Sequence, residues 1–433
     1  MKQRSLSWYA IAYAGTGIAQ KGFGFLLALW LAHTLSKDDY ARFGLLFALQ
    51  SGLTAFAMAG IAEVVISFLA THQGDASRAR LFRSANTVFV ALSLLLAVVA
   101  ALVYVFYLRH NGVHWLWFAC VVAGGVLAAQ FLLQSNFVRL EEKHSEAILF
   151  GFAAPMAGLA GAAAAFAIWR DVGSYFLGFA VASALMLAGV RAAGIGNFRV
   201  SQGREEVDPI RKAIAPYMGV AALGWLSGYG NIWVVEALFP ARFVAEFTFA
   251  YTLSAILQLA ANAMNQVWSP RFFNIVHTAA AAEIDRQNMR FYRFQGLVLG
   301  VLSAIIVVGL PYLLKLLGGN LAQYDIADGL AWLFAGYAVT IPWWHAQNYF
   351  LVHGEGGRLM RIVVVTALLG MGAWFAAMLI FGSGGIYLGF FLLMLFRSIG
   401  IWFVARRFWA ISLPWHGPAL ACVLIAISVW TGK

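Results

Sequence analysis

The chain has 433 residues, of which 62% are hydrophobic and only 11% charged, and its formal net charge is +11. A water-soluble domain carries about 25% charged residues, so this composition excludes a soluble protein folded around one core. The excess positive charge is therefore not expected to bind nucleic acid. It predicts loops that face anionic lipid headgroups.

Thirteen long apolar stretches fill the sequence, and a helix needs about 20 such residues to cross the hydrocarbon core of a bilayer. In chain order they cover residues 8–34, 40–70, 83–108, 113–137, 147–169, 173–194, 213–236, 244–275, 293–317, 327–352, 359–381, 384–405 and 415–431. The second and eighth must tilt or project beyond the bilayer, and the thirteenth is short and interrupted by Pro418. The pattern predicts an all-α polytopic membrane protein with twelve or thirteen transmembrane helices.

The orientation follows from the basic residues. Lys and Arg fall mostly in alternate gaps between the apolar stretches, and such a bias places the basic gaps, and here the N-terminus, in the cytoplasm. The first apolar run, from Trp8 to Thr34, is longer than the about 7–15 residues of a signal-peptide core. We therefore expect it to remain as the first span.

The gaps also predict the domain organisation. We expect an N-terminal six-helix lobe over residues 1–194, a cytoplasmic linker over 195–212, a C-terminal six-helix lobe over 213–408 and a possible short extra helix over 409–433, with a central cavity between the lobes. The gap Val276–Tyr292 is rich in Ala and charged residues and is typical of an amphipathic surface helix. Gly158, Gly161 and the run Ala162–Ala165 in the fifth span predict close helix packing.

The two lobes show a weak internal repeat. The second and eighth spans align without gaps when Tyr40 faces Val244, and Leu49 then faces Leu253. Transporters built from two related halves hold their substrate between the halves. The alternative is a chance alignment, because apolar sequence discriminates poorly.

Short motifs beside these spans resemble a known family. Leu31-Ala-His-Thr-Leu-Ser-Lys-Asp-Asp-Tyr40, Ala237-Leu-Phe-Pro-Ala-Arg-Phe-Val-Ala-Glu-Phe247 and Trp268-Ser-Pro-Arg271 are similar to helix ends and turns of Wzx-type polysaccharide flippases. These belong to the multidrug/oligosaccharidyl-lipid/polysaccharide exporter superfamily. The family usually has Gly after both turns, whereas Ala41 and Ala245 stand here, and Ala still permits close packing.

The resemblance implies a non-enzymatic flippase of a bacterial inner membrane. Its substrate would be an undecaprenyl-pyrophosphate-linked oligosaccharide, moved by alternating access from the cytoplasmic to the periplasmic leaflet for surface polysaccharide such as O-antigen, exopolysaccharide or lipopolysaccharide. Besides this lipid-linked oligosaccharide and the membrane lipids, a polysaccharide polymerase and a chain-length regulator are possible partners. No cofactor is implied, and coupling to H⁺, Na⁺ or the membrane potential stays open.

Two cations and one acid lie deep in the predicted spans. Lys21 is flanked by Gly22 in the first span, and Arg397 lies in the twelfth. A charge at the bilayer centre costs roughly 2.5–3.5 kcal/mol and usually faces a partner or a watery cavity, so both cations could bind a pyrophosphate. Lys21 could instead pair with Glu63, and Arg397 could extend to the headgroups.

Polar side chains in three other spans could line a cavity. Asn262, Asn265 and Gln266 share one helix face by their spacing and could bind sugar hydroxyls. They could equally form interhelical hydrogen bonds, which is the interpretation we favour for Gln130 and Gln134 in the fourth span.

The stretch from Pro342 to Asn348 is the most polar deep segment. Pro342 should kink its helix, Trp343 and Trp344 could stack on sugar rings, and His345 could couple protons. Asn348 could bind the substrate as well. The alternative is a packed kink with satisfied polar groups, because a proline frees backbone groups that need partners.

Other functions are weighed against this one. The chain has no Walker A loop, no Cys/His metal spacing and no nucleophile elbow, so ATP-driven transport and catalysis are not expected. A multidrug exporter would favour an anionic cavity, whereas two of the three deep charges are cationic. A polymerase or ligase would need a large outer loop, and a scaffold would leave the deep charges unexplained.

Overall fold

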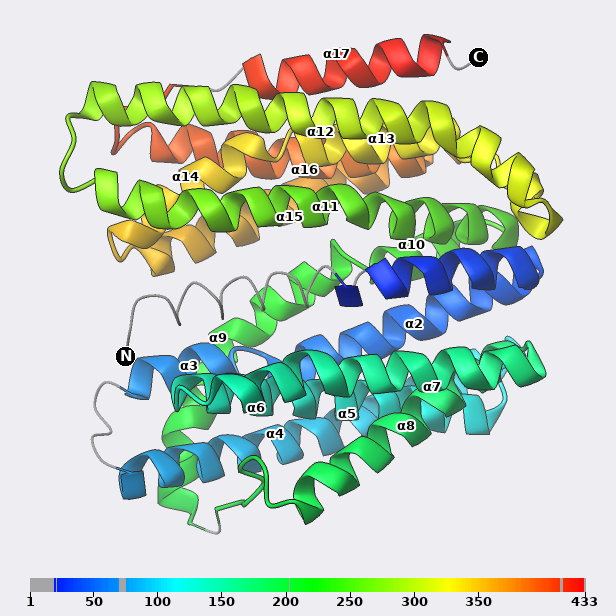
Figure 1. Ribbon diagram of the computed structural model, residues 1–433, viewed down its shortest axis with the longest axis vertical. Coiled ribbons are helices and arrows are strands. Elements are labelled where there is room, and N and C mark those ends of the chain that lie inside the picture. Colours follow the sequence, from blue (N-terminus) through cyan, green and yellow to red (C-terminus); the bar gives the residue numbers. More distant parts are fainter. Residues whose placement is uncertain (1–18, 21, 70–74, 202, 413–415, 432–433) are drawn as a thin grey trace. The chain divides into compact units, whose positions relative to one another are not determined.

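The computed structural model describes residues 19–20, 22–69, 75–201, 203–412 and 416–431, and all regular structure in them is helical (Figure 1). The chain divides into two compact units, residues 1–234 and 235–433. The first contains the helix Gly22–Thr34, α2 (Lys37–Met58), α3 (Ile61–Leu69), α4 (Asp75–Val103), the π-helical turn η1 (Tyr104–Leu108), α5 (Trp115–Leu140), α6 (His144–Ile148), the π-helical turn η2 (Leu149–Ala153), α7 (Ala154–Trp169), α8 (Val172–Ala192) and α9 (Arg204–Leu226). The boundary falls within α10 (Asn231–Leu238). The second contains α11 (Ala241–Ile275), α12 (Ala281–Leu317), the 3₁₀ turn η3 (Gly319–Gln323), α13 (Ala327–Ala338), α14 (Ile341–Val352), α15 (Gly356–Phe381), α16 (Gly384–Ala405) and α17 (His416–Thr431).

Nine helices of the described residues are long and apolar enough to cross a membrane, and three shorter apolar helices accompany them, at Gly22–Thr34, Tyr217–Leu226 and His416–Trp430. Large apolar side chains cover the outside of several of these helices, including Leu94, Val98 and Phe106, the last of which is 76% exposed. Such a surface requires a lipid environment, because soluble proteins rarely expose contiguous apolar patches of this kind. The prediction of an all-α polytopic membrane protein is confirmed.

Three predicted spans are broken rather than continuous. The stretch 40–70 is split between α2 and α3 at Gly60, whose φ of +76° favours glycine. A Cβ at Gly60 would also lie 2.3 Å from the Tyr217 ring. The stretch 213–236 is interrupted between α9 and α10, and the stretch 327–352 between α13 and α14. The eighth span, by contrast, is the continuous helix α11, so the two repeat-related stretches differ in shape.

The predicted surface helix over Val276–Tyr292 is wrong. Residues from Ala281 onward are the first turns of α12, which continues without interruption to Leu317. Charged side chains in its N-terminal turns are partly exposed and form ion pairs, such as Arg286 with Glu283. A polar opening and an apolar continuation can share one helix when it projects beyond the bilayer.

The first unit is organised around α2. This helix packs against α4, α5, α8 and α9, and Tyr40, Leu46 and Ala48 are completely buried. The predicted close packing of the fifth span is also observed, between α7 and α8. A Cβ on Gly161 would lie 2.5 Å from the Gly178 carbonyl oxygen, and one on Gly178 would lie 2.2 Å from the Gly161 oxygen.

The predicted linker is tied to the first unit by buried amides. Gln134 Nε2 donates to Asn86 Oδ1 at 3.3 Å and to the Asn197 oxygen at 2.9 Å, and the Asn197 N–H returns to Gln134 Oε1 at 2.8 Å. Gln134 therefore has the interhelical role favoured for it. Helix α9, predicted to open the second lobe, lies in the first compact unit, where Trp225 Nε1 donates to the Ala48 oxygen at 2.9 Å. The lobe boundary at 195–212 stays a prediction.

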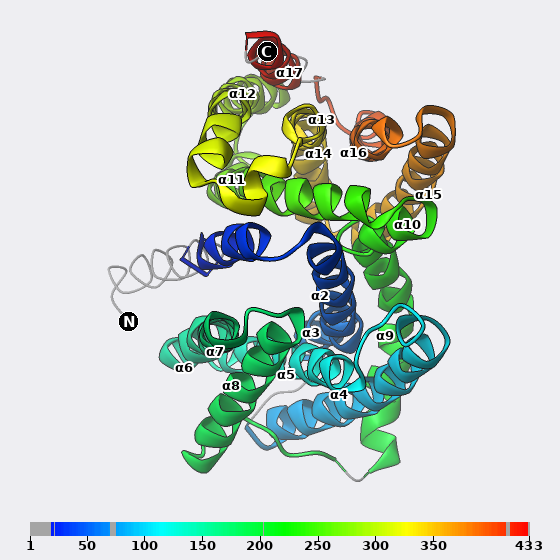
Figure 2. The same ribbon diagram turned by 90° about the vertical axis from the view of Figure 1, so that its right-hand side faces the viewer.

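The second unit is organised around α13. This helix lies among the helices of the unit (Figure 2) and contacts α11, α12, α16 and α17. Nine of its twelve residues are buried. The adjacent pairs α15–α16 and α12–α17 are also closely packed. In the second pair, a Cβ on Gly296 would meet the Gly417 backbone at 2.2 Å, so the last apolar segment is held firmly against α12.

Candidate functional site

Three of the predicted site residues fall, wholly or by their side chains, outside the part of the chain that the structure describes. Lys21 is not among the described residues, and the side chains of Glu63 and Gln266 are not described. The pairing of Lys21 with Glu63 and their part in substrate binding stay predictions. The remaining candidates, including Arg397, belong to the second unit.

Helix α14 positions most of these candidates. Its predecessor α13 ends at Ala338, and Thr340 Oγ1 turns back to the Tyr337 oxygen at 2.6 Å. Pro342 then occupies the first turn of α14, where a missing N–H leaves no helical bond unmade. The kink predicted at this proline is present as a break between the two helices.

One face of α14 carries Trp343 and meets α16. The Arg397 guanidinium carbon lies 4.3 Å from the centroid of the Trp343 ring, and the backbone N–H of Trp343 donates to Ser398 Oγ at 3.1 Å. Arg397 forms no ion pair with any carboxylate of the described residues, and its Nε is buried without a hydrogen-bond partner. The guanidinium of Arg397 is therefore held against the Trp343 ring and has one donor, Nε, without a partner.

Trp343 and Trp344 differ in their surroundings. Trp343 is only 6% exposed and is enclosed by Phe350, Ile362 and neighbouring side chains of α15 and α16. Trp344 is partly buried against the same cluster, and its Nε1 has no hydrogen-bond partner. Trp343 thus presents its ring to Arg397, whereas Trp344 Nε1 is a buried donor without a partner.

The opposite face of α14 carries His345 and Asn348, each 1% exposed. Asn348 Nδ2 donates to Asn265 Oδ1 at 3.3 Å, and Ser269 Oγ donates to Asn348 Oδ1 at 3.0 Å. The structure thus brings together two predicted residues from α11 and α14. Asn262, one turn earlier on α11, is partly buried. His345 Nε2 lies 3.3 Å from Gln295 Oε1 of α12.

Residues Asn288, Tyr292 and Gln295 of α12 were missed by the sequence analysis. All three are buried, and their spacing of four and three residues places them on one helix face. That spacing was a usable signal. It lies partly in the segment predicted to be a surface helix, which ends at Tyr292, and continues into the predicted ninth span with Gln295.

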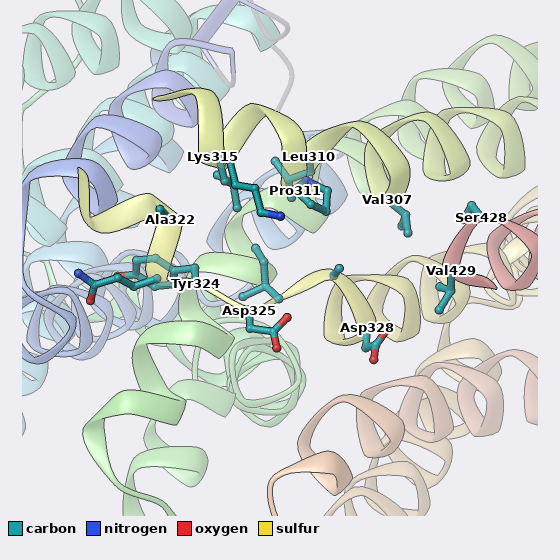
Figure 3. Close-up of a pocket in the computed structure, with 14 residues that line it drawn as sticks. Val307, Leu310, Pro311, Lys315, Ala322, Tyr324, Asp325, Asp328, Ser428 and Val429 are labelled. Atoms are coloured by element: carbon teal, nitrogen blue, oxygen red, sulfur yellow. The ribbon is translucent and has the colours of Figure 1, made fainter. Parts of the chain in front are cut away.

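A cavity of about 530 Å³ lies elsewhere in the second unit, between the end of α12, η3, the start of α13 and α17 (Figure 3). Lys315, Asp325 and Asp328 supply its charges, and Val307 and Leu310 contribute to its apolar wall. None of the predicted site residues lines it.

This fold is shared with membrane transporters of known structure. It matches "Lipid II flippase MurJ, inward closed conformation" with a TM-score of 0.73 at 10% identity, covering 97% of this chain and 92% of that one. A MATE transporter in the straight conformation matches with a TM-score of 0.56 at 14% identity, covering 90% and 93%. The eukaryotic MATE transporter AtDTX14 matches with a TM-score of 0.54 at 11% identity, covering 96% of each chain. The chain is therefore a multi-pass membrane protein with a flippase-like fold.

The family follows from the sequence match. The model of the family described as "Polysaccharide biosynthesis protein" matches residues 9–276, more than half of the chain. The chain belongs to this family, and the predicted resemblance to Wzx-type flippases is confirmed. No curated protein matches it in sequence.

Proposed function

We propose that the protein flips an undecaprenyl-pyrophosphate-linked oligosaccharide from the cytoplasmic to the periplasmic leaflet of a bacterial inner membrane. Family membership supports a role in polysaccharide biosynthesis, and the fold supports a transporter rather than an enzyme. The basic bias of alternate gaps supports a cytoplasmic N-terminus.

The observation that carries the proposal is Arg397. It is held on Trp343, has no carboxylate partner among the described residues and keeps an unpartnered Nε. A guanidinium can form a bidentate contact to phosphate oxygens, and a partly buried cation that has no carboxylate partner among the described residues favours an anionic ligand. Such a group suits a pyrophosphate better than a cationic drug.

Moving the headgroup of such a lipid across the bilayer is also physically feasible. The headgroup is anionic and hydrophilic, whereas the lipid tail can stay in the bilayer during transfer. Asn265 and Asn348 supply amide groups that could bind sugar hydroxyls once their mutual hydrogen bond opens. With the inside negative, moving one negative charge outward gains about 2.3 kcal/mol per 100 mV.

The test is the sidedness of the lipid-linked sugar. In a deletion strain, we expect repeat units to accumulate on the inner leaflet, protected from a membrane-impermeant glycosidase added to spheroplasts. Restoring the gene should expose them. Units that accumulate on the outer leaflet would instead indicate a polymerase. Normal sidedness together with drug sensitivity in the deletion strain would indicate a drug exporter.

A further inference from the structure

The second unit contains a buried polar cluster that the proposed function does not use. It lies where α11, α12 and α14 meet and includes His345, Gln295 and Asn288, none more than 1% exposed. His345 Nδ1, Gln295 Nε2 and Asn288 Oδ1 have no hydrogen-bond partner. Each buried polar atom left unpaired costs about 1–3 kcal/mol, so three in one place need an explanation.

His345 is at the inner end of this cluster. Its Nε2 lies 3.3 Å from Gln295 Oε1, and its ring is surrounded by Trp268, Phe291 and Tyr292, with centroids 6.1, 5.7 and 3.6 Å away. Aromatic rings around an imidazole can stabilise its protonated form through cation–π contacts.

The cluster continues along α12 toward the N-terminal end of that helix. Asn288 Nδ2 donates to the Tyr349 hydroxyl at 3.2 Å, and the Asp285 carboxylate acts electrostatically on Tyr292 and Tyr349. Asp285 also binds the N–H and hydroxyl of Ser412, at 2.8 and 2.5 Å, in an exposed setting. From Asp285 to Gln295 the helix rises about 15 Å.

These polar residues run from a partly exposed end at Asp285 to a buried end at His345. Beyond His345 the next buried groups are apolar or locally satisfied, such as Leu299 and Ser303, whose hydroxyl donates to the Leu299 oxygen at 2.6 Å. Buried polar groups with unused donors and acceptors commonly hold ordered water. If water occupies these positions, a proton can reach and leave His345 only from the Asp285 end.

We propose that Asp285, Asn288, Tyr292, Gln295 and His345 form a hydrated path that delivers protons to His345, the proton-binding group of the second unit. Hydronium entering at Asp285 transfers one proton through water to His345 Nδ1, which leaves water and an imidazolium. The charge bias of the loops places the entrance in the cytoplasm. The proposal goes beyond the proposed function, because it holds for any substrate.

The charged and titratable groups around His345 are few. Helix α12 contributes Asp285 and Tyr292, and α14 contributes Tyr349. Helix α11 contributes Arg271, whose guanidinium carbon lies 5.9 Å from the Trp268 ring centroid. Asp285 favours an imidazolium and Arg271 opposes it, so removing the Asp285 charge should make protonation of His345 harder.

The test is ¹⁵N NMR of histidine-labelled protein in lipid nanodiscs, with the His345 signal assigned by its loss in His345→Gln. We expect a pH-dependent change of this signal within a titration from about pH 8 down to about pH 4, because burial disfavours the charged form of a histidine. Asp285→Asn should shift the change to lower pH. Asn288→Leu, which interrupts the path but keeps His345, should slow its exchange with water. The matched control is His353→Gln, because His353 directly follows the same helix, is exposed, and has its ring centroid 5.0 Å from that of Trp409.

A His345 signal that stays neutral and does not exchange with water across this range would overturn the proposal, as would an unchanged signal in both path variants. The measurement needs no transport, so a failed flippase assay with a titrating His345 would refute only the proposed function. Normal flipping with an inert His345 would refute only the proton path.

Discussion

Replacing Arg397 tests the anion-binding role most directly. Hydrogen bonds to a charged group contribute about 1.5–3 kcal/mol, so Arg397→Gln should slow flipping about 10–150-fold. Arg397→Lys keeps the charge but loses the planar fork and its fit on Trp343, and should give an intermediate rate. The effect should fall more on transport than on folding, because Arg397 has no ion pair to lose among the described residues, although its contact with the Trp343 ring is lost.

The assay is the rate at which a fluorescent lipid-linked oligosaccharide becomes accessible on the far side of proteoliposomes. Arg406→Gln is the matched control. Arg406 comes directly after the last residue of α16 and is exposed, and its guanidinium carbon lies 4.9 Å from the Trp402 ring centroid. Thermal unfolding in detergent separates loss of fold from loss of transport. Wild-type flipping by a stable Arg397→Gln protein would refute the reasoning.

Four further changes have expected outcomes. Gly161→Val should lower the melting temperature, because overpacking against the Gly178 backbone costs about 1–3 kcal/mol, whereas Gly189→Ala, with nothing within 4 Å, should leave it unchanged. Gln134→Leu should raise protease cleavage in the segment 195–203, since it removes the bonds to Asn197; unchanged cleavage would contradict this. Asn265→Leu should slow flipping and lower stability by about 1–3 kcal/mol, because Asn348 loses a partner; chemical denaturation measures the second effect. Lys21→Ala should abolish polysaccharide export while the protein stays in the membrane, and retained surface polysaccharide would remove Lys21 from the mechanism.

The membrane-spanning architecture could be predicted because length and hydropathy alone determine it. Apolar stretches such as 359–381 and 384–405 correspond closely to α15 and α16. The helix breaks were harder. The break at Pro342 is predictable because a proline has no backbone N–H to donate. Gly60, by contrast, cannot be told from other glycines of a transmembrane helix until its backbone conformation and its close approach to Tyr217 are known.

The site was predictable by residue type but not by pairing. A deep arginine and a cluster of deep polar residues stand out in apolar sequence, so Arg397, Asn265 and Asn348 could be selected in advance. That Arg397 lies on Trp343, and that Asn265 meets Asn348, depends on which helix faces meet. Such pairings arise from tertiary packing, which apolar periodicity leaves open.

Helix α14 connects the proposed anion site with the proposed proton path. Trp343 and His345 are two residues apart, so their side chains point to nearly opposite sides of the helix, one to Arg397 and the other to Gln295. The break at Thr340 and the positive φ of +70° at Gly354 bound this short helix at both ends. Two sites are coupled only when an element common to both has different energies in two states. A rotation of α14 would change both contacts together, which makes this helix the element through which proton binding could influence the substrate.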